Sequence, residues 1–170
     1  MKIKKEHLGI AFLVTLSLFI FIKSTSVIGI TAGNLEKDAR VSQKIDDNWD
    51  VSKSTTKHIG AMLFYNNTHD EFIFSIYLNR PDFSFGYFFA TGVVSGGIDD
   101  SIRELTYGSN GSVLISMNTK KVAKIELNND SDVTTINIDS TKPFVVVLPC
   151  NYGEMTLFDL NGNVVPMSAE

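Results

Sequence analysis

Residues that could carry metal chemistry occur in two short clusters of this sequence. Thr68-His69-Asp70-Glu71 groups three possible ligands, but adjacent side chains in an extended segment point in different directions. Asn128-x-Asp130-x-Asp132 resembles the start of a calcium-binding loop, and Asp139 falls at its twelfth position. Such a loop needs glycine at the sixth position, where this chain has Val133, and glutamate at the twelfth. We interpret both clusters as polar turns and expect no metal and no cofactor.

Nucleophilic catalysis has one candidate residue, Cys150, which follows Pro149 at the end of an apolar run. A catalytic thiol needs a base within hydrogen-bonding reach, and nothing in the sequence pairs Cys150 with a histidine. We interpret it as a free, partly buried thiol. Because it is the only cysteine, an intramolecular disulfide is excluded.

Paired carboxylates are the remaining route to catalysis. A glycosidase holds two of them about 5–10 Å apart on one surface. The acidic residues that follow the expected strands and could do this are Asp82, Asp99, Asp100 and Glu104. They support one of two function hypotheses, a carbohydrate-active or other hydrolase.

The element that fixes the location of all these residues is the charge-free run Leu8–Ile22. Lys2, Lys4 and Lys5 precede it, and basic residues keep that end of a membrane segment in the cytoplasm. Residues 1–23 are therefore either a signal-anchor or a cleaved signal peptide. The possible cleavage sites are poor, since none has the Ala-x-Ala pattern. We predict a single-pass cell-membrane protein whose C-terminal domain lies outside, or a secreted protein if the leader is cleaved.

The charge of the exported part limits its partners. The 170-residue chain has a net charge of −4, and removing Lys2, Lys4, Lys5 and Glu6 leaves 12 basic and 18 acidic residues, a net charge of −6. An acidic domain of this kind is a poor match for polyanions. We therefore expect no nucleic-acid partner, a membrane contact through Leu8–Ile22, and a protein or cell-wall partner.

Residues 24–58 are polar, and we interpret them as a stalk that contains a short helical turn around 35–41. The single tryptophan, Trp49, marks the expected start of the fold because a lone indole in a polar stretch usually packs against something.

Residues 59–170 have the pattern of an extracytoplasmic all-β domain. The runs 59–65 and 144–148 are apolar on both faces, which is typical of central strands. Turn residues such as Asn161-Gly162 separate further short runs at intervals of about 8–12 residues. We predict an antiparallel sandwich or barrel-like domain of about nine or ten short strands.

An aromatic stripe falls in one of these expected strands, where Phe83, Phe85, Tyr87 and Phe89 alternate with smaller residues. Core packing is the simpler interpretation, and Phe85→Ala or Tyr87→Ala would then each cost about 3–5 kcal/mol. An exposed stripe that stacks on sugar rings is the alternative.

The closing segment 156–165, Thr-Leu-Phe-Asp-Leu-Asn-Gly-Asn-Val-Val, resembles the final hairpin of many bacterial surface sandwich domains. With the leader, the layout is similar to that of small, N-terminally anchored extracytoplasmic β-domain proteins of Gram-positive bacteria. The resemblance implies a location outside the membrane and carries no activity.

The loop 95–101 is the best candidate for a binding surface. Glycines free its backbone, and the apolar Ile98 is followed by Asp99 and Asp100, which suits a basic or hydroxyl-rich partner. In the alternative, the loop is a connection whose Ile98 packs into the core. The apolar spacing of 98–105 suits one or two helical turns, and a strand through Tyr107 is the other possibility. The anchor, the stalk, the β fold and the missing acid–base constellation favour the other function hypothesis, a non-enzymatic interaction or accessory module.

Overall fold

The computed structural model describes residues 12–17, 20, 28–79, 85–96, 101–129 and 132–167, with the backbone alone at 93–96. Within these residues the folded part of the chain, from Ala32 onward, forms ten strands, the helix α2 after a short 3-10 turn, and a second 3-10 turn before β6. The elements are η1 (Ala32–Asn34), α2 (Leu35–Gln43), β1 (Asp50–Thr55), β2 (Ile59–Tyr65), β3 (Glu71–Asn79), β4 (Tyr87–Gly96), β5 (Ile102–Thr106), η2 (Gly108–Asn110), β6 (Ser112–Ser116), β7 (Val122–Asn129), β8 (Asp132–Asn137), β9 (Phe144–Leu148) and β10 (Glu154–Asp159).

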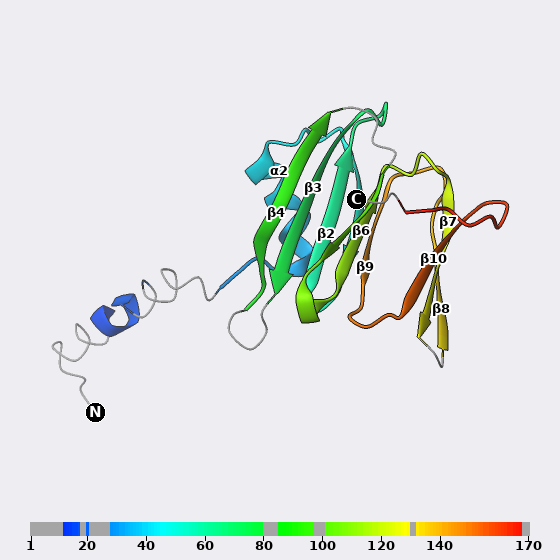
Figure 1. Cartoon of the computed structure of the whole chain (residues 1–170). Coiled ribbons are helices and arrows are strands. Elements are labelled where there is room, and N and C mark those ends of the chain that lie inside the picture. The colour runs from blue at the N-terminus through cyan, green and yellow to red at the C-terminus, as the bar shows by residue number, and fades with distance from the viewer. Residues whose placement is uncertain are drawn as a thin grey trace.

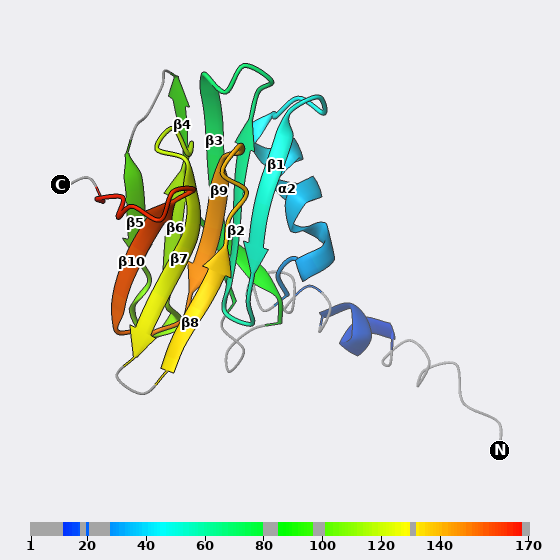
Figure 2. The same cartoon turned by 90° about the vertical axis from the view of Figure 1, so that its right-hand side faces the viewer.

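The strands form three antiparallel sheets with the orders β1-β2-β3-β4, β5-β6-β9 and β10-β7-β8. Figures 1 and 2 show them stacked as layers, with α2 on the outer face of the first sheet and β5-β6-β9 in the middle. The all-β antiparallel prediction is confirmed in this layered, sandwich-like form, and no closed barrel is present among the described residues.

The middle sheet is buried on both faces, which explains its unbroken apolar runs. Because successive side chains of a strand point to opposite faces, Val113 and Ile115 of β6 pack toward the first sheet while Leu114 packs toward the third. In β9, Val145 and Val147 share the first of these cores, and Phe144 lies in the second. The predicted burial of 144–148 on both faces is therefore confirmed, although β9 lies at one edge of its hydrogen-bonded sheet.

The first sheet also has two buried faces. In β2, Leu63 faces the middle sheet, whereas Met62 and Phe64 face α2. The helix covers this outer face with Leu35 and Ala39, which lie one turn apart and are buried.

The structure differs from the predicted stalk over the described residues 28–58. Instead of standing free, this stretch supplies α2 and β1, and Trp49 packs with the helix against the first sheet. The sequence of this stretch is mostly polar because α2 buries only a narrow stripe of side chains, and most other side chains of the helix are charged or polar. The Glu36 carboxylate contacts Arg40 at 3.2 Å and Lys53 at 3.0 Å on this surface.

The aromatic stripe is only partly a core feature. Tyr87 is 7% exposed, as the core interpretation requires, but Phe85 is 75% exposed and Phe89 is 52% exposed. The reason is position: β4 begins at Tyr87 and forms an edge of its sheet, and Phe85 precedes it in an isolated bridge with Ile28. The predicted stability cost of Phe85→Ala therefore does not apply, and Phe83 lies outside the described residues.

Two further sequence interpretations are resolved by strand pairing. Residues 102–106 form β5, so the strand alternative is correct and the described part of 98–105 contains no helical turn. The closing hairpin is confirmed, since Asp159 N–H donates to the Asn163 carbonyl at 2.9 Å across Asn161-Gly162.

The N-terminal run is described only at residues 12–17 and 20, which have helical backbone and exposed apolar side chains. No helix within the described residues has the length and apolar character needed to cross a bilayer.

Candidate functional site

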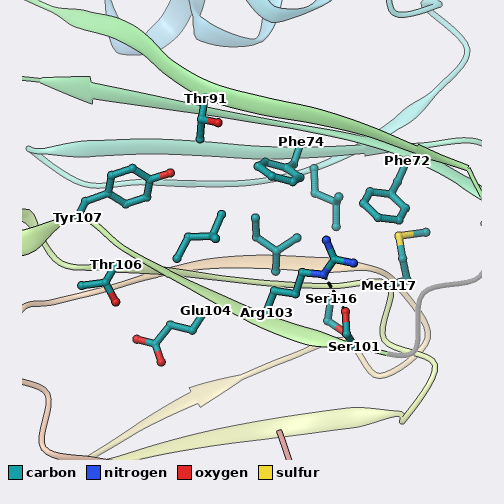
Figure 3. Close-up of a pocket in the computed structure, with 13 residues that line it drawn as sticks. Phe72, Phe74, Thr91, Ser101, Arg103, Glu104, Thr106, Tyr107, Ser116 and Met117 are labelled. Carbon is teal, nitrogen blue, oxygen red and sulfur yellow. Dashed lines mark hydrogen bonds between the residues drawn. The ribbon is translucent and has the colours of Figure 1, made fainter. Parts of the chain in front are cut away.

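A cavity of about 520 Å³ lies between the first sheet and the middle sheet. This volume falls within the roughly 300–1,000 Å³ that is usual for small-molecule sites. The lining residues come from β2 to β6 and the segments beside them, and Figure 3 shows how they face each other across the gap. They are Leu63, Phe72, Phe74, Thr91, Ser101, Arg103, Glu104, Leu105, Thr106, Tyr107, Ile115, Ser116 and Met117.

The two walls of the cavity are apolar and belong to the same core cluster. Leu63, Phe72 and Phe74 come from the first sheet, and Ile115 and Met117 come from β6 and the residue that follows it. These side chains are buried because they occupy the inward positions of strands whose other face packs elsewhere. The walls can therefore hold an apolar molecule without leaving a polar group unsatisfied.

Strand β5 supplies the polar groups, and alternation decides which of them enter the cavity. Arg103, Leu105 and Tyr107 share the face toward the first sheet, and Figure 3 shows the Arg103 side chain extending between the walls. Arg103 Nε donates a hydrogen bond to Ser101 Oγ at 2.9 Å. The cavity thus combines an apolar body with a guanidinium group and the Tyr107 phenol, whose pKa is raised by burial.

Glu104 points away from the cavity centre in Figure 3. Its carboxylate accepts a hydrogen bond of 2.6 Å from the Tyr152 hydroxyl, which lies toward the third sheet. Burial, followed by this hydrogen bond, raises the pKa of Tyr152 to about 12. Among the described lining residues Glu104 is the single carboxylate, so the paired acids of a glycosidase are not assembled there.

Among the described residues, hydrogen bonds join the two sheets that enclose the cavity along one side. The backbone N–H groups of Val145 and Val147 in β9 donate to the hydroxyl oxygens of Ser52 (3.2 Å) and Ser54 (3.0 Å) in β1. On the opposite side, β4 and β5 belong to different sheets and are not paired within the described residues. The cavity lies on this second side, where Thr91 of β4 faces β5.

The predicted binding residues belong to the connection between β4 and β5. Ile98, Asp99 and Asp100 lie outside the described residues, as does Asp82 of the hydrolase hypothesis. Of the predicted acids, only Glu104 is placed, and its partner is Tyr152.

The residues considered for metal or thiol chemistry lie in turns and at strand ends. His69 sits in the β2–β3 turn, where the Asp70 carboxylate accepts hydrogen bonds from Thr68 (2.6 Å) and Asn66 (2.5 Å). Asn128 and Asp132 lie on the paired strands β7 and β8. No group of three possible metal ligands occurs among the described residues. Cys150 is exposed rather than partly buried, because it lies in the turn after β9.

Comparisons with protein-family models, with curated proteins and with solved structures gave no match. The cavity is therefore the structural feature from which a function can be inferred. Sequence reasoning placed Phe72 and Phe74 in a core strand but did not identify the cavity, since it forms between strands that are far apart in the chain.

Proposed function

We propose that this protein is a membrane-tethered or secreted extracytoplasmic module that acts by binding and not by catalysis. Its site is the cavity between the first and middle sheets, and its ligand is a small amphipathic molecule with an alkyl or aromatic body. The observation that carries this proposal is the cavity of about 520 Å³ with two apolar walls.

The composition of the lining favours binding. Enzyme sites that act by acid–base chemistry place their titratable groups against the substrate. Here the apolar side chains form the walls, and the single carboxylate of the described lining, Glu104, is bonded to Tyr152 toward the third sheet. The guanidinium of Arg103 can orient a polar head group while the body of the ligand is buried.

Photolabelling of the full-length protein in lipid nanodiscs tests the proposal. The probe is dodecanoic acid with a diazirine at its chain end, and adducts are located by mass spectrometry of peptides. We expect adducts in β3, β5 and β6, whose side chains form the walls. Leu105→Trp should reduce these adducts at least several-fold because the indole fills the cavity.

The matched control is Ile136→Trp, a similar enlargement at a partly buried position of β8 that packs in the other core. Labelling of this variant should equal that of the wild type, and circular dichroism should show that both variants remain folded. If Leu105→Trp is labelled as strongly as wild type in the same peptides, or if adducts spread evenly over the domain, the cavity is not the binding site.

A further inference from the structure

The chain joins the first sheet at one defined end. Gly29 N–H donates to the Phe85 carbonyl at 2.6 Å, and the backbones of Ile30 and Tyr87 exchange two hydrogen bonds of 2.8 Å. A Cβ atom on Gly29 would lie 2.5 Å from the Tyr87 carbonyl oxygen, so only glycine allows this approach. Gly86 has φ +93°, a conformation that side chains disfavour. The segment that follows the leader is therefore fixed against the start of β4.

The same end of the sheet presents apolar side chains to the surroundings. Ile28 is 64% exposed and Phe85 is 75% exposed, and the two residues form a β-bridge with each other. The neighbouring β1–β2 turn contributes an exposed lysine, Lys57, whose carbonyl accepts a hydrogen bond of 3.0 Å from Asn79 Nδ2. Asn79 in turn pairs with Tyr87, which places these groups at one end of the sheet.

The length of the connection limits how far this end can lie from the leader. Six residues lie between Ile22, the end of the apolar run, and Gly29, so seven residue steps join the two Cα atoms. Fully extended, they span at most about 25 Å, at roughly 3.3–3.6 Å per residue. If the run lies in a bilayer, Ile28 and Phe85 are held close to the lipid surface. An exposed aliphatic and aromatic pair beside a lysine matches the chemistry of side chains that insert into the headgroup region.

We propose that this end of the domain, formed by Ile28, Lys57 and Phe85, rests on the lipid surface and inserts Ile28 and Phe85 among the headgroups. This inference rests on the membrane tether of the proposed function. It adds to that proposal because it specifies which end of the domain faces the membrane. The turn 66–70 at the opposite end of the first sheet then points away from the membrane.

Spin labelling measures this orientation in the full-length protein reconstituted in vesicles of phosphatidylcholine and phosphatidylglycerol. The exposed Cys150 is first replaced by serine, and Phe85→Cys or Thr68→Cys is then labelled with a nitroxide. Thr68 is the matched control, because it is also exposed but lies in the turn at the far end of the sheet. At position 85 we expect the ratio of oxygen to nickel-complex accessibility to be several-fold higher than at position 68. Replacing the exposed Phe85 should leave the melting temperature unchanged.

A carbonate wash of the same vesicles distinguishes the inference from the proposal on which it rests. If the protein stays in the membrane and the two labels are equally accessible to the nickel complex, the resting surface is wrong and the tether stands. If the protein is removed by carbonate, the tether fails, and the resting surface fails with it.

Discussion

Asn118 is a buried polar residue whose replacement should destabilise this fold. It is 3% exposed and lies between the middle sheet and the third sheet. Its side-chain oxygen accepts the Val122 N–H at 2.7 Å. Its Nδ2 donates to the carbonyls of Val122 (3.2 Å), Asp139 (3.2 Å) and Lys142 (3.1 Å). One side chain therefore satisfies the start of β7 and the loop that leads into β9.

Two effects contribute to the expected loss of unfolding free energy in Asn118→Ala. Leaving the buried Val122 N–H and its neighbouring carbonyls unpaired costs about 1–3 kcal/mol. Asn118 also has φ +57°, and alanine in that left-handed conformation costs roughly 1–2 kcal/mol. We expect a loss of about 2–5 kcal/mol in the free energy of unfolding, which lowers the melting temperature of a domain of this size by about 10 °C.

Asn118→Gly separates the two parts. Glycine removes the same hydrogen bonds but accepts the positive φ, at the expense of about 0.5–1 kcal/mol of additional backbone freedom in the unfolded chain. The glycine variant should therefore be more stable than the alanine variant by roughly 0.5–1 kcal/mol. Thermal unfolding followed by far-UV circular dichroism measures both. An alanine variant that melts with the wild type would refute the assigned role of these hydrogen bonds.

Two further predictions concern the contacts around the first sheet. Ser52→Ala and Ser54→Ala should each lower stability by about 0.5–1.5 kcal/mol, because each leaves a β9 N–H without its hydroxyl acceptor. The control, Thr134→Ala on the exposed β8, should leave stability unchanged. Urea unfolding of the three variants measures these differences. Equal midpoints would show that the hydrogen bonds from β9 to Ser52 and Ser54 do not stabilise the fold. Hydrogen bonds from Lys53, the largest cause, and from Arg40 lower the pKa of Glu36. The ionised Glu36 carboxylate therefore stabilises the fold above the ordinary pKa of a carboxyl, and this stabilisation is lost as the pH falls through the lowered pKa. Glu36→Gln should therefore lower stability by less than about 1 kcal/mol at pH 7. The melting temperatures of wild type and variant should converge in acid, and a constant difference down to low pH would refute this explanation.

The strands were predictable wherever the apolar pattern is local and complete. The run 59–65 is apolar at every position, and the structure buries all seven residues of β2 between the helix and the middle sheet. The turn Asn161-Gly162 carried its own signal, because glycine readily adopts the φ of +81° that Gly162 has in the hairpin.

What the sequence did not reveal depends on contacts between distant segments. Helix α2 buries only Leu35 and Ala39 in its nine residues, so its stripe was too narrow to distinguish it from a polar stalk. Phe85 and Tyr87 have the same alternation in sequence, yet only Tyr87 has neighbours on β3 and α2 to cover it. The cavity requires Phe74 of β3 to face Ile115 of β6, and no local pattern states which strands face each other.

The middle sheet packs against the first sheet on one face and the third sheet on the other, and this arrangement limits the order in which the chain can fold. All four strands of the first sheet lie before residue 97, but their inner face is covered by β6 and β9, and β9 ends at Leu148. The hydrogen bond from Val145 to Ser52 joins residues 93 positions apart. The first sheet therefore keeps an apolar face exposed until most of the chain is available.

Folds that depend on such distant pairings fold in about milliseconds to seconds, more slowly than helical domains of similar size. With a single cysteine, the chain also has no intramolecular disulfide to hold an early intermediate together. The core between the first and middle sheets therefore forms only after β9, late in the chain, is available.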